Sequence, residues 1–294
     1  MSYHLIDGRK VAEEVTTALE PRLAALRESG TNPGLAVVVV GDDPASHVYV
    51  RMKGRACERL GMASRSHALP STTPEEELLG LIDALNEDPE VHGILCQLPL
   101  PSHIDERKVI DRIALEKDVD AFHPYNVGRM LIGDPLFLPA TPSGIQHLLV
   151  TSGVELKGRH VVVLGRSNIV GKPIAAMLMQ KGPGGDATVT VAHSRTRDLQ
   201  GITSQADVLI AAVGIPLFVK RDMVKEGAVV IDVGTNRVDD PGTEKGYKLV
   251  GDVDFDDVKG KVSAISPSPG GVGPMTIAML MANTVLAAEM AIGR

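Results

Sequence analysis

Short apolar runs bounded by turn residues recur along the chain and alternate with segments that carry apolar residues at helical spacing. Runs of this kind predict strands, and their alternation with helices predicts parallel sheets covered by helices. We therefore expect an α/β protein. The expected strands are Leu35–Val40, Gly93–Leu98, Val161–Leu164, Thr188–Ala192, Val208–Val213 and Ala228–Val233.

The pattern changes at a link bracketed by Pro139 and Pro142, and 294 residues are enough for two domains with separate cores. We predict an N-terminal α/β catalytic domain with a mainly parallel sheet over residues 1–140 and a Rossmann-like domain over residues 141–273. A final helix over residues 274–294 is expected to return to the first domain. A short connection would leave a cleft between the halves, where substrates commonly bind.

Two helices near the ends of the predicted first domain follow from the same pattern. Gly8–Glu28 is expected to be one helix that ends before Gly30, because its apolar residues recur at helical spacing. Ser143–Ser152 is expected to be the helix that leads into the second domain.

Composition narrows the class of protein. A net charge of −7 and a pI near 5.7 argue against nucleic acid or an anionic membrane as a partner. Cys57 and Cys96 lack metal-ligand spacing and are expected to be buried thiols.

No targeting or membrane segment is predicted. Charged residues stand near the N-terminus, where a signal peptide needs an apolar core. The apolar segment Thr276–Gly293 contains Asn283 and Glu289, which favours a buried helix over a membrane span. We expect a cytoplasmic enzyme.

A glycine-bounded turn follows the expected strand Val161–Leu164 and precedes a helical pattern, with the sequence Gly165-Arg-Ser-Asn-Ile-Val-Gly171. Gly165 permits a tight turn, and a helix that starts at Gly171 presents free backbone N–H groups to an anion. The pattern Gly-x-Ser-x-x-x-Gly differs from the commoner Gly-x-Gly-x-x-Gly, and many α/β proteins use such turns for packing alone. In this context the turn predicts a dinucleotide site.

The next expected strand ends in His193-Ser194-Arg195-Thr196-Arg197, which contains no carboxylate. In NAD sites an acidic residue at this strand end binds the ribose 2′-hydroxyl, whereas an arginine accommodates a 2′-phosphate. Arg166 and Arg195 would supply positive charge, and Ser167 and Ser194 would supply hydroxyl groups. The predicted cofactor is therefore NADP. The alternative is that both arginines are ordinary solvated charges.

Tyr49 and Lys53 lie four residues apart in a segment whose Pro44 suits a helix start, with Asp43 or Ser46 as its cap. They would share one helical face near the carboxyl end of the preceding strand. The ring can stack on a flat heterocycle, and a partly desolvated lysine can have a lowered pKa and transfer protons. A packed tyrosine and a solvated lysine are the alternative.

Three further segments carry candidate polar groups or a special turn. Gln97 ends an apolar run and would emerge at the sheet edge that Lys53 faces, unless it only caps its own loop. Asp118 and Asp120 lie in one loop, where charge runs usually face solvent but a carboxylate in a cleft would bind a ring N–H. The glycine- and proline-rich turn Ile265–Thr276 favours close approach of a ligand to its backbone, since a turn with no ligand would need fewer special residues. The histidines show no metal-binding spacing, so no metal is predicted.

Taken together, these motifs closely resemble the bifunctional methylenetetrahydrofolate dehydrogenase/cyclohydrolase family over nearly the whole chain. The motifs are Tyr49-x-x-x-Lys53, Gln97-Leu-Pro-Leu-Pro101, Lys117-Asp-Val-Asp120, Gly165-Arg-Ser-Asn-Ile-Val-Gly-Lys-Pro173 and Pro269-Gly-Gly-Val-Gly-Pro-Met-Thr276. The resemblance implies oxidation of 5,10-methylenetetrahydrofolate with NADP, hydrolysis of the methenyl product to 10-formyltetrahydrofolate, and a homodimer formed through the nucleotide domains.

The resemblance also implies residue roles. Lys53 would be the central catalytic residue, Gln97 would position it, Tyr49 would stack on the folate and Asp120 would anchor the pterin. The predicted substrate-binding residues are Tyr49, Gln97, Leu98, Pro99, Asp120, Pro269, Gly270, Gly271 and Thr276. The predicted cofactor-binding residues are Gly165, Arg166, Ser167, Gly171, Ser194, Arg195, Gly214 and Thr235.

The chain departs from the family pattern without losing a proposed catalytic group. Ala140 stands where relatives often carry cysteine, Ala121 where glycine is common, and Ser266 and Ser268 alter the usual Thr-Pro-Val-Pro approach to the glycine turn. Two other functions remain as alternatives. A dehydrogenase without hydrolysis would not need both Lys53 and Gln97, and a nonenzymatic NADP-sensing module would need only the glycine loop.

Overall fold

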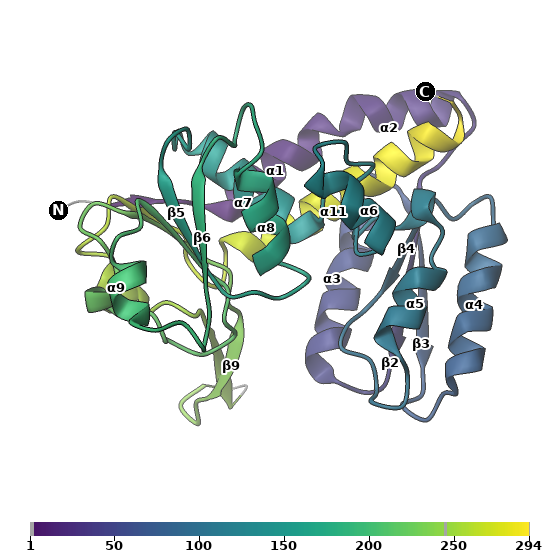
Figure 1. Ribbon diagram of the computed structural model, residues 1–294. Coiled ribbons are helices and arrows are strands. Elements are labelled where there is room, and N and C mark those ends of the chain that lie inside the picture. The colour runs from purple at the N-terminus through teal and green to yellow at the C-terminus, as the bar shows by residue number, and fades with distance from the viewer. Residues whose placement is uncertain (1–2, 244–245, 294) are drawn as a thin grey trace. The chain divides into compact units, whose positions relative to one another are not determined.

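The computed structural model describes residues 3–243 and 246–293 and confirms an α/β fold with parallel sheets and flanking helices (Figure 1). The chain forms two compact units. Unit 1 combines Met1–Ala12 with Thr141–Thr276, and unit 2 combines Glu13–Ala140 with Ile277–Arg294. The predicted first domain, residues 1–140, therefore loses its N-terminal segment to unit 1. The reason is that the N-terminal strand β1 (His4–Leu5) pairs with the sheet of that unit.

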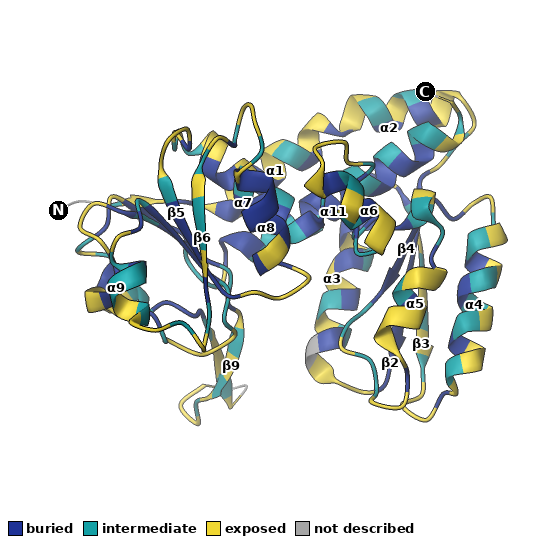
Figure 2. Cartoon of the chain, in the orientation of Figure 1, coloured by how far each residue is buried: buried dark blue, intermediate teal, exposed yellow. Residues whose placement is uncertain are grey.

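Unit 2 is built on a parallel sheet of three strands in the order β3-β2-β4. Alternate residues of β2, namely Ala36, Val38 and Val40, pack on a core to which helices α4 and α5 contribute (Figure 2). The elements are α2 (Glu20–Glu28), β2 (Gly34–Val40), α3 (Pro44–Leu60), β3 (Ala63–Leu69), α4 (Glu75–Glu87), β4 (Gly93–Cys96), α5 (Glu106–Arg112), the 3₁₀ turn η1 (Leu115–Lys117) and α6 (Pro124–Leu131).

Unit 1 holds a parallel sheet of six strands in the order β1-β11-β8-β7-β5-β6, and a separate antiparallel pair, β9 and β10. Its elements after β1 are α7 (Ala140–Thr151), β5 (His160–Leu164), α8 (Gly171–Leu178), β6 (Thr188–Ala192), α9 (Leu199–Thr203), β7 (Val208–Ala211), η2 (Arg221–Met223), β8 (Val229–Asp232), β9 (Asn236–Asp239), β10 (Tyr247–Val250), α10 (Phe255–Val258) and β11 (Ala264–Ile265). The helices α1 (Gly8–Ala18) and α11 (Val272–Ala291) contain residues of both units.

Both sheets reverse their strand order at one place. In unit 1, β6 lies on one side of β5 and β7 lies on the other. In unit 2, β3 and β4 flank β2 in the same way. In sheets of this kind, ligands bind outside the carboxyl ends of the strands at the point where the order reverses. These two edges are where the candidate groups are expected to lie.

The predicted elements differ from the structure in local details. Gly8–Glu28 is two helices rather than one, because Pro21 lacks the N–H that would continue the ladder past Leu19. The strand β3 was not predicted, since Ala63–Leu69 alternates half-buried and exposed residues and is mostly polar or small. Pro142 lies in the first turn of α7, so the proline-bracketed link is largely helical.

Helix α11 is long and apolar enough to cross a membrane by length and composition, but its contacts within unit 2 are those of a core helix. The Asn283 amide donates to the carbonyl oxygens of Val119 at 2.8 Å and Leu138 at 2.9 Å. Glu289 accepts two hydrogen bonds from Arg22 of α2, at 2.8 and 2.6 Å. The helix thus packs back on the first domain, as predicted.

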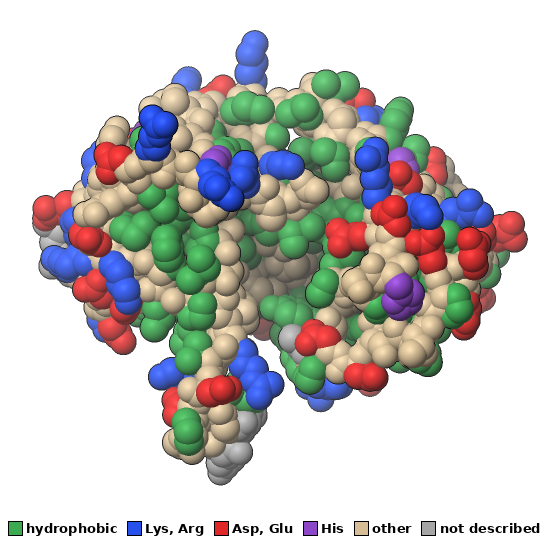
Figure 3. Space-filling model, turned by 60° about the horizontal axis from the view of Figure 1, so that its bottom comes forward, with side chains coloured by type: hydrophobic (Ala, Val, Ile, Leu, Met, Phe, Trp, Pro, Cys, Tyr) green, Lys and Arg blue, Asp and Glu red, His purple; other side chains and the backbone are tan. Residues whose placement is uncertain are grey.

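Charged side chains of both signs are present on the face of the molecule drawn in Figure 3. On the face in Figure 3, lysine and arginine side chains are interspersed with aspartate and glutamate. This mixture accompanies the acidic net charge of −7.

Candidate active site

Helix α3 carries Tyr49 and Lys53, and its start is set by a side-chain cap. One carboxylate oxygen of Asp43 accepts hydrogen bonds from the Ser46 N–H and hydroxyl, both at 2.8 Å. Pro44 is the first helical residue, where its missing N–H costs nothing. Of the two caps predicted, Asp43 is therefore the one that acts. The cap fixes where α3 leaves β2, and hence where Lys53 lies.

Lys53 and Gln97 meet at the carboxyl edge of the sheet. The Lys53 ammonium donates to the Gln97 side-chain oxygen at 2.9 Å, and the Gln97 amide donates to the Leu98 carbonyl at 2.9 Å. Lys53 is only 7% exposed. Strand β4 ends at Cys96, two residues before the predicted end at Leu98, and the N–H of the next residue, Gln97, still donates to the Val38 carbonyl of β2. The glutamine both orients the lysine and bonds its own loop.

Burial perturbs the titration of Lys53 and Asp120 in opposite directions. Loss of solvent lowers the pKa of Lys53 below its ordinary 10.5, while the charge of Asp120 opposes this. Loss of solvent also raises the pKa of Asp120, and the Lys53 charge opposes that shift. The lysine therefore gives up its proton more readily than a solvated lysine does.

Asp118 holds the loop that carries Asp120. It is 2% exposed and accepts hydrogen bonds from the N–H groups of Phe122 at 3.2 Å and His123 at 2.9 Å and from the Asn126 amide at 2.8 Å. Burial raises the pKa of Asp118 to about 6, against these three donors. Asp118 is thus a structural carboxylate, not a solvated one.

The backbone conformation of Ala121, the residue after Asp120, shows why glycine is common at this position in the family. Ala121 has a φ of 57°, in the left-handed region that glycine adopts without steric cost. A residue with a Cβ stands here under strain of about 1 kcal/mol.

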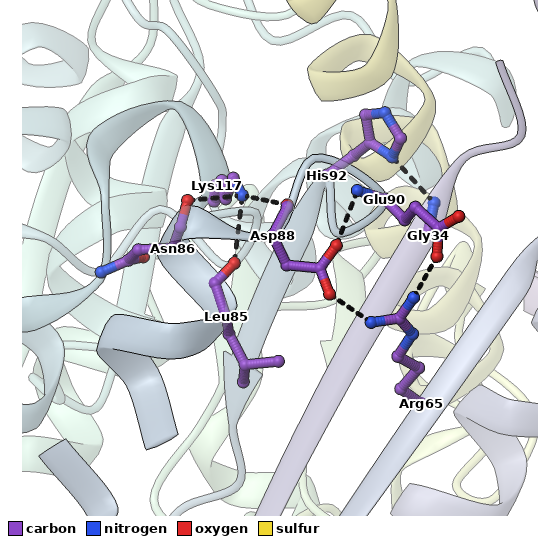
Figure 4. A network of polar contacts seen from close by, with 8 residues as sticks. All are labelled: Gly34, Arg65, Leu85, Asn86, Asp88, Glu90, His92 and Lys117. Carbon is purple, nitrogen blue, oxygen red and sulfur yellow. Dashed lines mark hydrogen bonds and ion pairs between the residues drawn. The ribbon is translucent and has the colours of Figure 1, made fainter. Parts of the chain in front are cut away.

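Lys117 anchors the chain just before this loop (Figure 4). Its ammonium donates to the carbonyl oxygens of Leu85 at 3.0 Å, Asn86 at 2.7 Å and Asp88 at 2.8 Å, at the C-terminal end of α4. A cation at this position bonds carbonyls that the helix leaves unpaired. Arg65 in turn forms ion pairs with Asp88 and with Glu90. The charge run 117–120 therefore ties the loop to α4.

The glycine turn of unit 1 lies where β5 and β7 diverge. Gly165 has a φ of 127°, and a Cβ on it would lie 2.1 Å from the Ala212 carbonyl oxygen. A Cβ on Gly171 would lie 2.4 Å from the Gly165 carbonyl oxygen. The Ser167 hydroxyl oxygen accepts from the N–H groups of Val170 at 3.2 Å and Gly171 at 3.3 Å. Both glycines are sterically required, and the N–H of Gly171, which was predicted to be free, donates to Ser167.

The loop after β6 is a tight turn that leaves its cationic side chain exposed. His193 Nδ1 accepts from the Arg195 N–H at 3.1 Å, and the His193 N–H donates to the Thr196 hydroxyl oxygen at 2.9 Å. Ser194 and Arg195 are exposed, as is Arg166. Across residues 3–243 and 246–293, the guanidinium groups of Arg166 and Arg195 make no hydrogen bond or ion pair. This donor set fits the phosphates of a dinucleotide.

The second glycine-rich turn packs closely on α1. A Cβ on Gly8 would lie 1.8 Å from the Gly271 carbonyl oxygen, so the two backbones touch. The Ser268 hydroxyl donates to the Gly234 carbonyl, a bond that a valine there would not make. Helix α11 begins at Val272, so Thr276 lies within the helix rather than in the turn, and its hydroxyl lies 2.9 Å from that of Thr141. The turn is held from several directions within unit 1.

The predicted site residues divide between the two units. Unit 2 brings Lys53 to Gln97 by a hydrogen bond and to Asp120 by charge, with Leu98 and Pro99 following Gln97 and a half-buried Tyr49 one turn before Lys53. Unit 1 holds the predicted cofactor-binding residues, and the remaining predicted substrate-binding residues, Pro269, Gly270, Gly271 and Thr276. Among the described residues, no group of three or more histidine, cysteine or acidic side chains is arranged to hold a metal ion.

Two buried carboxylates of unit 1 were not predicted from the sequence. Asp232 ends β8 and is 3% exposed, and Asp252 follows β10 and is 0% exposed. Each accepts hydrogen bonds from backbone N–H groups beyond the strand ends. The signal in the sequence was an aspartate within two residues of a glycine at the end of an apolar run, in Asp232-Val-Gly234 and Gly251-Asp252.

These features define a class: a two-unit α/β enzyme in which one unit binds a nicotinamide dinucleotide. Two family descriptions match the chain. Residues 6–120 match "Tetrahydrofolate dehydrogenase/cyclohydrolase, catalytic domain", and residues 139–292 match "Tetrahydrofolate dehydrogenase/cyclohydrolase, NAD(P)-binding domain". The chain belongs to the tetrahydrofolate dehydrogenase/cyclohydrolase family, as its motifs predicted.

Individual relatives match over their full length. The bifunctional protein FolD of Moorella thermoacetica is 58% identical over 289 residues, which cover 98% of this chain and 100% of that protein. The solved structure of the bifunctional FolD of Campylobacter jejuni aligns with a TM-score of 0.92 at 46% identity, covering 98% of this chain and 99% of that one. The Trypanosoma brucei FolD, solved with NADP and an inhibitor, aligns with a TM-score of 0.95 at 41% identity over 100% of both chains.

Proposed function

We propose that this chain oxidises 5,10-methylenetetrahydrofolate to the 5,10-methenyl form with NADP and then hydrolyses that product to 10-formyltetrahydrofolate. The observation that carries the proposal is the 2.9 Å hydrogen bond between the buried Lys53 ammonium and Gln97, with Asp120 as the nearby charge. A dinucleotide-binding unit alone would need none of these three side chains. Their arrangement supports chemistry on the folate.

Lys53 is the proposed proton-transfer group of the hydrolysis. Water attacks the cationic methenyl carbon, a C–O bond forms, and the C=N electron pair moves to nitrogen. Lys53 in its amine form accepts the proton that the water loses. The ammonium returns the proton to one nitrogen of the adduct. The bond from carbon to that nitrogen then breaks, and the adduct's hydroxyl group loses its proton to solvent as it becomes the formyl carbonyl. A lysine with a lowered pKa suits both transfers, because both of its forms are accessible.

The neighbours of Lys53 are proposed to bind and orient the folate. The Gln97 oxygen directs the lysine, and the ring of Tyr49, one helical turn away, stacks on the substrate. Asp120 anchors the pterin through charge-assisted hydrogen bonds. Leu98 and Pro99 in unit 2 and the turn residues Pro269, Gly270, Gly271 and Thr276 in unit 1 complete the proposed substrate-binding set.

The cofactor-binding edge of unit 1 is proposed to select NADP. When bound, NADP supplies the hydride acceptor for the oxidation. Gly165, Ser167 and Gly171 receive its phosphates, and Gly214 and Thr235 line the same edge. Arg195, with Arg166 and Ser194, meets the 2′-phosphate, because their exposed groups are available and His193–Arg197 contains no carboxylate.

One assay tests the function. The purified protein is given methylenetetrahydrofolate with NADP or NAD, and the formation and decay of the methenyl product are followed by absorbance. We expect formation with NADP and faster decay than in buffer. Formation without enzyme-dependent decay would indicate a monofunctional dehydrogenase, and neither signal from folded protein would refute the proposal.

We further propose a homodimer through the nucleotide-binding units and a cytoplasmic location. The first follows from family membership, and sedimentation analysis tests it. The second is supported by the acidic composition and by the contacts that hold α11 in unit 2. Fractionation of cells producing the protein tests it.

A further inference from the structure

We infer that Asp252, locked in place by Asp232, is a positioning residue that sets the Val213–Gly214 backbone for cofactor binding. This inference rests on the proposed binding of NADP to unit 1. It assigns a role to two buried carboxylates that the reaction itself does not use.

The carboxylate of Asp252 accepts the backbone hydrogen bonds of the chain where β7 ends and the hydrogen bonding between strands stops. The last ladder bond on this side runs from the Ala212 N–H to the Leu164 carbonyl at 2.8 Å. The next two N–H groups, of Val213 and Gly214, both donate to one Asp252 oxygen, at 2.7 and 2.9 Å. The other oxygen accepts from the Asn236 amide at 2.9 Å. A single carboxylate therefore determines the direction of the chain beyond the strand.

Asp232 holds the segment that carries Asp252, because its carboxylate accepts hydrogen bonds from backbone N–H groups of that segment. One Asp232 oxygen accepts from the Asp252 N–H at 2.9 Å and from the Gly234 N–H at 3.0 Å. The other accepts from the Val253 N–H at 3.1 Å. The Asp232 N–H donates to Ser266 at 2.8 Å. Burial and the Asp252 charge raise the pKa of Asp232 to about 7, and the three backbone donors oppose that shift.

The two motifs interlock through their glycines. A Cβ on Gly251 would lie 1.7 Å from an Asp232 oxygen, and a Cβ on Gly234 would lie 2.2 Å from an Asp252 oxygen. Each carboxylate thus occupies the space that a side chain on the other motif would fill. This mutual exclusion leaves one arrangement for both strand ends.

The far side of Gly214 is open, which separates positioning from simple packing. Gly214 has a φ of 69°, and no atom lies within 4 Å of the position its Cβ would take. The rest of this loop is tied by the Leu217 N–H, which donates to the Gly251 carbonyl at 2.9 Å. The loop is held on its protein side by residues 251 and 252 and presents its other side to a ligand.

The test exchanges the two polar partners of the interlock. In Asp252→Asn, whichever way the amide turns, its NH₂ group faces another donor, from Asn236 or from Val213 and Gly214. The double variant Asp252→Asn/Asn236→Asp restores every bond with one reversed. We expect the Kd for NADP, measured by titration calorimetry, to rise about tenfold in Asp252→Asn and to return to within about threefold of wild type in the double variant.

Two controls distinguish the outcomes. Asp207→Asn removes a carboxylate from the opposite end of the same sheet, where it accepts from the His160 N–H at 3.0 Å and pairs with Lys225 at 2.6 Å. It is expected to lower the melting temperature without changing the NADP Kd. Methenyl hydrolysis, which needs no NADP, is expected to persist in all variants.

An unchanged NADP Kd in Asp252→Asn, or a loss that the double variant does not reverse, would overturn the inference while leaving the proposed function intact. A wild-type protein that binds no NADP would overturn both. Where Asp252→Asn alone does not fold, Asn236→Asp carries the same test. Its two facing carboxylates should weaken NADP binding, and adding Asp252→Asn must restore it.

Discussion

The two units hold their functional groups in opposite ways. In unit 2 the candidate groups are side chains, and burial shifts the pKa values of Lys53 and Asp120. In unit 1 the candidate groups are largely backbone groups, at Gly165, Gly171 and Gly214. Close packing and hydrogen bonds from neighbouring residues hold that backbone in place. A single substitution can remove a side chain. A backbone group can be displaced only by substituting the residues that pack against it or bond to it. The two edges should therefore respond differently to mutation and to pH.

The largest expected effect comes from Lys53→Met, which keeps the apolar stem and removes the amine. Methenyl hydrolysis should fall about a thousandfold, because a positioned proton-transfer group contributes that much. The NADP Kd should remain as in wild type, since Lys53 belongs to unit 2 and the cofactor edge to unit 1. Stopped-flow absorbance and calorimetry measure the two quantities.

The matched control for Lys53→Met is Lys108→Met, which removes a lysine of the same unit whose charge pairs at the surface with Glu75 at 2.7 Å. Hydrolysis should be unaffected there. A large loss of NADP binding in Lys53→Met would mean that the two edges do not act separately.

Arg195→Ala tests the side-chain part of the otherwise backbone-built edge. We expect the Kd for NADP to rise about tenfold and that for NAD to stay nearly constant, because only NADP carries the 2′-phosphate. Arg159→Ala removes an exposed arginine just before β5, at the opposite end of the strand, and should change neither. Equal weakening of both cofactors in Arg195→Ala would remove this residue from the 2′-phosphate site.

Much of this arrangement was predictable because it depends on strand ends. Strand β2 and the strands of unit 1 that precede Gly165 and Arg195 are short apolar runs, so the positions of the loops after them follow from the sequence. The meeting of Lys53 and Gln97 follows as well, because parallel strands present their carboxyl ends at one edge.

The residues that hold these loops in place were not predictable, because their roles depend on contacts between segments that are distant in the sequence. Asp232 and Asp252 are 20 residues apart, and the glycine near each one does not indicate that the two carboxylates contact each other's backbone segments. Lys117 and Asp118 resemble a solvated charge run, yet one bonds the end of α4 and the other bonds the turn after Asp120. The pairing of β1 with β11, which moves the N-terminal segment into unit 1, has no local signal either.

The pH dependence of hydrolysis gives a finer test of the side-chain site. The Asp120 charge raises the pKa of Lys53, while burial lowers it. Removing that charge in Asp120→Asn should therefore lower the lysine pKa further, and the rising limb of kcat against pH should move to lower pH. KM for the folate should rise separately, because Asp120 is also the proposed anchor. A limb that stays in place or moves to higher pH would show that Lys53 does not set it.

The smallest expected effect concerns the ion pair between Arg22 and Glu289, which joins α2 to α11 in unit 2. Its bonds are short and bidentate, but the side chains are 38% and 19% exposed, so solvent screens much of the attraction. Arg22→Met should lower the free energy of unfolding by about 1 kcal/mol, measured by urea denaturation.

A double-mutant cycle with Glu289→Gln separates the contribution of the ion pair from that of the arginine's apolar stem. Hydrolysis and NADP binding should both be unchanged at a temperature well below unfolding, because the pair joins α2 to α11 and supplies no proposed catalytic or cofactor-binding group. A selective loss of hydrolysis in Arg22→Met would instead show that the placement of α11 against α2 controls the Lys53 site, so that the side-chain site of unit 2 also depends on contacts outside it.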